Sequence, residues 1–116
     1  MKESLENRAL PDEVRNKMLT VICYNLADSL TNQGEYEEAT RISEAGLWHG
    51  RTVGSHRMDG LLYYSLAKAQ QLMGNIESAF ENFHNSYYSH KAHRKIEKAE
   101  MVKKFALEKY GVQIEG

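Results

Sequence analysis

Hydrophobic positions recur every three or four residues along most of the chain, which is the spacing of amphipathic helices rather than strands. The first predicted helix begins at Pro11, whose fixed backbone angle suits a first helical turn. It carries an apolar stripe about five turns long, of the kind that faces a core: Val14, Met18, Val21, Ile22, Leu26 and Leu30. Proline occurs once in the chain, and its scarcity favours uninterrupted helices. We therefore predict an all-α fold.

Four further helices follow, and each has an expected inner side. The second carries Tyr36, Ala39, Ile42 and Gly46 and fades near Gly50; the third carries Met58, Leu62, Leu66, Ala69 and Met73. The fourth carries Ile76, Ala79, Phe80, Phe83 and Tyr87; the fifth carries Ile96, Ala99, Val102 and Ala106, with Met101 and Phe105 on its next side.

Glycines and capping residues mark the expected helix ends. Gly34 and Gly74 can take the left-handed conformation that stops a helix. The segment 50–55, GRTVGS, is the main loop, and its Ser55 is a candidate N-cap for the third helix. Residues 3–9, ESLENRA, are expected to be the end of an earlier helix.

Two stretches of the chain repeat each other at an offset of forty residues: NQGEYEEA at 32–39 is echoed by LMGNIESA at 72–79. The matched pairs are Tyr24 with Tyr64, Leu26 with Leu66, Ala27 with Ala67, Gly34 with Gly74, Glu37 with Glu77 and Ala39 with Ala79. Small residues let antiparallel helices cross closely, and glycine permits the tight turn between them. The repeat therefore predicts two helical hairpins, each of which buries its open face against the next.

This pattern resembles the tetratricopeptide repeat (TPR) family, which has a leucine and a small residue in the first helix, a glycine at the turn, an aromatic residue, and an alanine. These positions read Leu26, Ala27, Gly34, Tyr36 and Ala39 in one copy, and Leu66, Ala67, Gly74, Ile76, Ala79 and Phe83 in the other. The resemblance implies a TPR-like α-α superhelix, with repeat 1 at 12–50, repeat 2 at 55–91 and a C-terminal capping helix at 94–110. The period exceeds the usual roughly 34 residues, and Arg51 and Lys91 stand where the family has a proline.

Lengthened repeats of this kind are similar to those in the C-terminal sensor halves of Gram-positive helix-turn-helix transcription regulators, and in related aspartate phosphatases. The regulators are cytoplasmic bacterial proteins that bind short signalling peptides. The resemblance implies a ligand-sensing regulatory domain. Neither a DNA-binding helix-turn-helix nor a phosphatase helical bundle is visible in the sequence, so the chain corresponds to the sensor part alone.

In such repeats the first helix of each pair lines a concave groove. The residues expected to face it are Tyr24, Asn25, Asp28 and Thr31 in the first copy, and Tyr64, Ser65, Lys68 and Gln71 in the second. An amide such as that of Asn25 can both donate to and accept from an extended peptide backbone. The expected ligand is a short peptide or protein segment, and the alternative interpretation is a polar, solvated face. A carboxylate clamp would need more cations than Lys68 and Lys98.

No catalytic or metal site is predicted. His90 and His93 share a helix side, and His84 lies about a turn and a half upstream. No cysteine or carboxylate is placed to complete a zinc site, so we expect surface histidines, as for His49 and His56. Cys23 has no cationic neighbour to form a thiolate and is expected to be structural. Phosphate-binding and hydrolase motifs do not occur. We expect a protein that is not an enzyme and has no cofactor.

Composition limits the partners. The 116 residues carry 15 basic and 16 acidic side chains, a net charge of −1 that gives no field for nucleic acid or an anionic membrane. Glutamates interrupt the basic HKAHRKIEK stretch, which favours a solvated helix side. A single cysteine, no signal-like start and no long apolar run indicate a cytoplasmic protein.

A second hypothesis is a homo-oligomerisation or adaptor scaffold without a peptide ligand. Two and a half repeats fall below the roughly three that a stable array needs, so we expect dimerisation or excision from a longer protein. Trp48, Tyr87 and Tyr88 lie late in the second helix of each pair, where we expect core packing, with a homodimer interface as the alternative.

Overall fold

The computed structural model describes residues 11–115, which form five α-helices and no strand. Their bounds are α2 Asp12–Asn32, α3 Tyr36–Thr52, α4 Asp59–Met73, α5 Ile76–Ala92 and α6 Ile96–Tyr110. The all-α prediction is confirmed, whereas the helix end predicted at residues 3–9 lies outside the described residues. None of the described helices is both long and apolar enough to cross a membrane.

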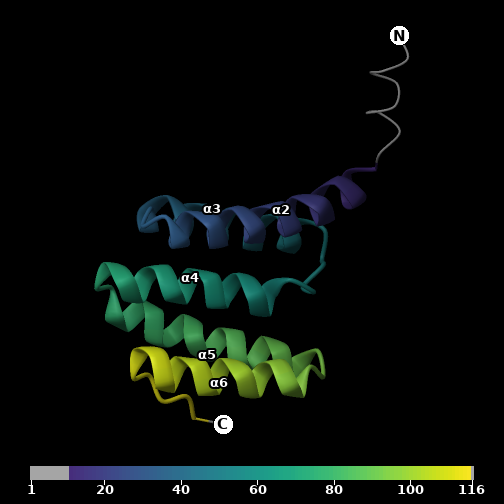
Figure 1. Ribbon diagram of the computed structural model, residues 1–116. Helices are drawn as coiled ribbons and strands as arrows, with labels where there is room; N and C mark the ends of the chain where they lie inside the picture. Colours follow the sequence, from purple (N-terminus) through teal and green to yellow (C-terminus); the bar gives the residue numbers. More distant parts are fainter. Residues whose placement is uncertain (1–10, 116) are drawn as a thin grey trace.

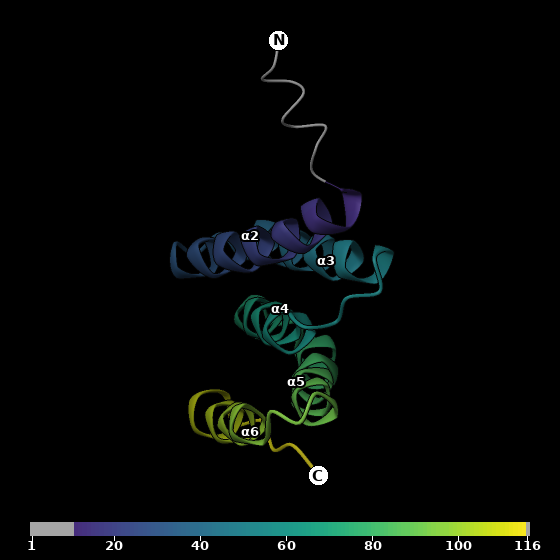
Figure 2. The ribbon, with the colours of Figure 1, turned by 90° about the vertical axis from the view of Figure 1, so that its right-hand side faces the viewer.

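Consecutive helices pack as adjacent antiparallel pairs, from α2 against α3 through to α5 against α6. The helices form a stack with α2 and α3 at one end and α6 at the other (Figure 1). Figure 2, turned by 90° about the vertical, shows α4 and α6 on the same side of α5. α2 also contacts α4 directly, although α3 lies between them in sequence. The first helices of the two hairpins therefore meet along one side of the molecule.

Small residues line the close contacts, as the repeat predicted. Ala27 and Ala39 are fully buried in the first hairpin, and Ala67 and Ala79 are fully buried in the second. At Gly46 a β-carbon would lie 2.9 Å from Cys23 Cβ and 2.9 Å from Leu62 Cδ2. Because any side chain there would collide, this glycine lets α3 approach α2 and α4 at the same time.

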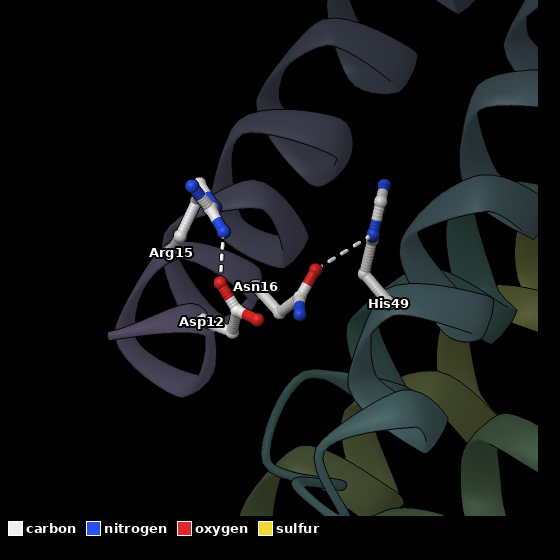
Figure 3. A network of polar contacts seen from close by, with 4 residues as sticks. All are labelled: Asp12, Arg15, Asn16 and His49. Carbon is white, nitrogen blue, oxygen red and sulfur yellow. Dashed lines mark hydrogen bonds and ion pairs between the residues drawn. The ribbon is translucent and has the colours of Figure 1, made fainter. Parts of the chain in front are cut away.

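A polar contact joins the other end of the first hairpin. The Nδ1 atom of His49 on α3 donates a hydrogen bond to Oδ1 of Asn16 on α2, at 3.1 Å (Figure 3). Both side chains are half-buried, so His49 is not the surface histidine that we expected. Asp12 and Arg15 pair on the exposed first turn of α2 beside this contact (Figure 3). Of these two polar contacts, the one made by His49 joins α2 to α3, and the other lies within α2.

The turns follow a period of twenty residues, half of the repeat found in the sequence. Gly34, Gly54, Gly74 and Arg94 have positive φ angles of 84°, 68°, 89° and 61°. In each turn the next N–H donates to the carbonyl five residues earlier, from residues 35, 55, 75 and 95 to residues 30, 50, 70 and 90. This is the hydrogen bond of a Schellman helix end. The fourth turn of the series cannot be recognised from the sequence, because Arg94 stands where the other three turns have glycine.

The apolar stripe predicted on the first helix does not face the core. Val14, Met18, Val21, Ile22 and Leu26 are exposed, and α2 instead buries Thr20, Cys23, Ala27 and Thr31. The reason is the close approach of α3, which only small side chains permit, so the large side chains lie on the opposite side of α2. The stripe marks a face suited to packing, but no described residue covers it.

Several smaller expectations are also wrong. Ile76, Phe80 and Ile96 are exposed rather than buried, and of the three late aromatic residues only Tyr87 is in the core, while Trp48 and Tyr88 are exposed. Ser55 does not cap the third helix, because α4 begins four residues later at Asp59. The backbone N–H of Ser55 instead donates to the Gly50 carbonyl at 2.8 Å and closes the end of α3.

The segment after α6 packs back onto the stack, which the sequence did not lead us to expect. Val112 and Ile114 are buried in one cluster with Phe83 and Tyr87. The hydroxyl of Tyr88 donates to the Glu115 carbonyl at 2.5 Å, and the N–H of Glu115 donates to His84 Nε2 at 3.3 Å. This tail covers apolar surface of α5 and α6 that would otherwise be open.

The turn series predicts the effect of replacing Arg94. A left-handed conformation is strained for any residue with a β-carbon, and glycine relieves that strain but loses more chain entropy on folding. We expect Arg94→Gly to raise the free energy of unfolding by about 0.5–1 kcal/mol, and Gly74→Ala to lower it by about 1 kcal/mol. Urea denaturation measures both values. Arg94→Ala keeps the β-carbon and is the control; equal stability of the Gly and Ala variants would contradict the strain.

Candidate functional site

A hollow of about 260 Å³ lies where α2, α4 and α6 face one another. Its lining is mainly aromatic and aliphatic: Tyr24, Leu61, Tyr64, His90, Lys98, Met101, Val102 and Phe105. α5 supplies only His90, from its last turn. The hollow therefore belongs to the side of the stack on which the first helices of the hairpins meet α6. Its size suits one apolar side chain rather than a whole cofactor.

Two tyrosines from equivalent positions of the repeat form one wall of this hollow. Burial, together with the neighbouring Tyr110 and Tyr24, raises the pKa of Tyr64 to about 12. Burial and the nearby Asp28 carboxylate also raise the pKa of Tyr24. The Tyr64 ring packs edge-on against Phe83, with centroids 5.8 Å apart. Both hydroxyls therefore stay protonated at neutral pH and can donate hydrogen bonds, on rings that packing holds in place.

A contact between α2 and α4 lies beside the tyrosines. Nζ of Lys68 lies 3.3 Å from Oδ1 of Asp28, again between equivalent positions forty residues apart. The same ammonium lies 5.3 Å from the centroid of the Tyr64 ring. A partly exposed ion pair contributes at most about 1 kcal/mol. Its effect is to keep the Lys68 side chain along the tyrosine wall.

His90 is buried, which corrects the expectation of a surface histidine. Its ring occupies the space left by Gly60 on α4, where a β-carbon would lie 2.5 Å from His90 Cε1. Ser86, one turn earlier, donates a hydrogen bond to the Gly60 carbonyl at 2.6 Å. Burial, together with the charges of Lys95 and Lys98 and the nearby His93, lowers the pKa of His90 to about 4. The hollow thus has a neutral imidazole in its wall at pH 7.

The structure brings together four of the eight residues predicted to face the groove: Tyr24, Asp28, Tyr64 and Lys68. Asn25 and Ser65 come one position later in their helices, a rotation of about 100°, which turns them away from the hollow. Asn25 is exposed among the apolar residues of α2, and Ser65 is buried without a hydrogen-bond partner among the described residues. The expectation that Ser65 faces the groove is therefore wrong.

The two polar residues near the helix ends also point elsewhere. Thr31 is buried and its hydroxyl donates to the Ala27 carbonyl at 2.9 Å, so it does not face a ligand either. Gln71 is half-buried, and its Oε1 has no hydrogen-bond partner within residues 11–115.

Most of the lining residues were not predicted, because the repeat was followed only as far as the second hairpin. Extending the offset of forty residues once more aligns Val21 and Leu61 with Met101. That alignment identifies Met101 as the α6 residue that faces the hollow. Nothing in the sequence points to His90, whose burial depends on the missing side chain of Gly60.

The other side chains that could carry chemistry, His84, His93 and Cys23, do not line the hollow. His84 Nδ1 donates to the Phe80 carbonyl and His93 Nδ1 to the Ser89 carbonyl, both at 2.9 Å. Within residues 11–115, no group of three or more His, Cys, Asp or Glu side chains is placed to hold a metal ion. Burial raises the pKa of Cys23, which stays a thiol at neutral pH.

The buried imidazole predicts a loss of stability in acid. The pKa of His90 is lower in the folded protein than the ordinary 6.5, so the unfolded chain binds a proton that the folded protein excludes as pH falls from about 6.5 to 4. We expect this group alone to cost on the order of 2 kcal/mol of unfolding free energy between pH 7 and pH 4. Urea denaturation of the wild type and of His90→Gln at both pH values measures the share of the acid destabilisation that is due to His90.

The matched control is His93→Gln, which removes an exposed imidazole and should keep the acid sensitivity of the wild type. If His90→Gln is too unstable to measure, an NMR titration of the wild-type imidazole decides. A His90 resonance that titrates near pH 6.5 would contradict the burial.

Comparisons of the chain with protein-family models, with curated proteins and with solved structures found no match. Any functional conclusion therefore depends on the residues of the chain itself and on the geometry of the hollow between α2, α4 and α6.

Proposed function

We propose that the chain is a TPR-like binding module whose hollow between α2, α4 and α6 holds an apolar side chain of a short peptide or extended protein segment. The observation that carries the proposal is the convergence of equivalent helices on one hollow with aromatic and aliphatic walls. The forty-residue repeat and the packing of each hairpin on the next support a TPR-like superhelix.

The chemistry of the lining favours a peptide over a charged metabolite. Tyr24, Tyr64 and Phe105 provide large surface at low entropic cost, and Met101 is flexible enough to adapt to different side chains. Tyrosine hydroxyls and the Lys98 ammonium lie among these apolar groups. They can bond the carbonyl or carboxylate groups of a peptide whose side chain enters the hollow.

The resemblance to peptide-responsive regulators extends the proposal to a regulatory role. We infer a ligand-sensing domain of a bacterial, cytoplasmic transcription regulator, in which the peptide changes the spacing of the hairpins. The domain binds its ligand without transforming it. Support for this comes from the protonated tyrosines and the neutral thiol of Cys23, which offer no activated nucleophile. A helix-turn-helix encoded in the same reading frame would support this role.

A matched pair of substitutions on α6 tests the hollow. Met101 lines it and Leu107 does not, yet the two side chains are 50% and 52% exposed. We expect hydrophobic peptides of five to eight residues to bind the wild type with micromolar affinity in calorimetry. Met101→Glu should weaken binding at least tenfold, because it places a charge in an apolar wall.

Leu107→Glu makes the same change of charge on the same helix and should leave peptide binding unaltered. Circular dichroism confirms that both variants fold. An equal loss in both variants, or no binding of any peptide to the wild type at millimolar concentration, would reject the hollow as the site.

A further inference from the structure

The face of α2 that points away from α3 is mainly apolar. Near its start, Val14, Met18 and Val21 border a hollow of about 300 Å³ that Lys17, Ser55, Arg57 and Met58 also line. The large side chains of this face are Val14, Met18, Val21, Ile22 and Leu26, all of them exposed. From Met18 to the end of the helix, every exposed residue is uncharged: Met18, Val21, Ile22, Asn25, Leu26, Ser29 and Asn32. We call these seven residues together with Val14 the outer α2 face. Charge depletion of this extent is typical of interface cores rather than of solvated helix surfaces.

The repeat shows that the outer α2 face corresponds to a packing surface. Ile22, Leu62 and Val102 occupy equivalent positions at intervals of forty residues, and they are 52%, 0% and 6% exposed. The next turn behaves in the same way, since Leu26 is exposed whereas Leu66 and Ala106 are buried. In α4 and α6 the preceding helices cover these positions. In α2 no described residue does so.

The contacts at α4 show what such a face requires. Leu62 packs beneath Gly46 of α3 and forms one apolar cluster with Cys23, Leu47 and Leu66. Complete burial of two leucines stabilises by several kcal/mol in total. The outer α2 face carries side chains at the equivalent positions. Burying them against another surface is therefore expected to give a comparable stabilisation.

The opposite end of the stack decides which cover fits. There, Val112 and Ile114 of the tail are already buried against α5 and α6. In α4 and α6 these positions are covered by the second helix of a hairpin, α3 or α5. Both of those helices are already packed against the next helix, α3 against α4 and α5 against α6, so a second copy cannot offer either of them to α2. Head-to-tail growth lacks a complementary surface. Two copies can still pair like with like through the surface that both leave open, which gives closed twofold symmetry.

We propose that two copies of this chain form an antiparallel dimer through their outer α2 faces. The spacing of the side chains is symmetric about the level of residue 20, because Val14 and Leu26 lie equally far from it, as do Met18 and Ile22. An antiparallel pairing centred there places Met18 of each copy opposite Ile22 of the other. Apolar groups then meet apolar groups along about four helical turns, and the charged Arg15, Lys17 and Asp28 lie at the edges of the contact.

The size of the face sets the strength of the dimer. Five half-exposed aliphatic side chains amount to on the order of 400 Å², about half of the roughly 800 Å² that each partner contributes to a standard interface. We therefore expect a dissociation constant in the micromolar range. Tyr24, the residue of α2 that lines the hollow, is not part of the outer α2 face, so the dimer does not depend on the proposed peptide binding.

Sedimentation velocity across about 5–500 µM chain, without added peptide, tests the proposal. The wild type should shift from monomer to dimer with concentration, and Ile22→Glu should remain monomeric. The matched control is Leu107→Glu, since Leu107 is 52% exposed like Ile22, and this variant should dimerise as the wild type does. A wild type that stays monomeric at 500 µM, or an Ile22→Glu variant that still dimerises, would overturn the proposal.

A mixing experiment tests the antiparallel register. Met18→Lys and Ile22→Glu should each be monomeric alone, because each buries like charges or unpaired charges at the interface. Mixed in equal amounts they should dimerise, since lysine of one copy then faces glutamate of the other. Circular dichroism verifies that both variants are folded. Two folded variants that do not associate when mixed would rule out this register.

Discussion

The rest of the structure depends on the burial of α4 from two sides. One side of α4 carries Gly60 and Ala67 and lies close to α5; another carries Leu62 and Leu66 and is covered by the first hairpin. Small side chains are needed where helix axes approach closely, and large ones fill the space beside a more distant neighbour. Because two sides of α4 are packed against neighbouring helices, only one narrow side of this helix is free of helix packing. That remaining side carries Leu61, Tyr64 and Lys68.

The candidate site follows from this division of sides. Because α4 uses two of its sides for packing, its third side faces the hollow, which residues of α2 and α6 close. The hollow therefore combines residues far apart in sequence, such as Tyr24 and Met101. The neutral His90 belongs to the same arrangement, since its ring fills the space that Gly60 leaves between α4 and α5. The hollow and the packing of the hairpins thus use different sides of the same helix, α4.

Part of the site could be predicted from the repeat, and part could not. Tyr24 and Tyr64 were identified because both copies carry the same residue on the same side of a first helix. Ser65 was misplaced because one position along a helix is a rotation of about 100°, which is enough to move a side chain from the groove into the packed face. His90 had no signal, since its burial depends on a glycine thirty residues away.

The sequence by itself determined the helices, the tight turns at Gly34 and Gly74 and the forty-residue repeat, because periodicity and left-handed glycines act over a few neighbouring residues. Only the tertiary structure decided which apolar residues are buried. Ile22 and Leu62 occupy the same position in the same pattern, yet one is exposed and the other is not, because burial depends on what lies across the contact and not on the helix that carries the residue. The same reason explains the tail: Val112 and Ile114 have no periodic neighbours that predict packing, and they are ordered by the apolar surface of α5 and α6 on which they lie.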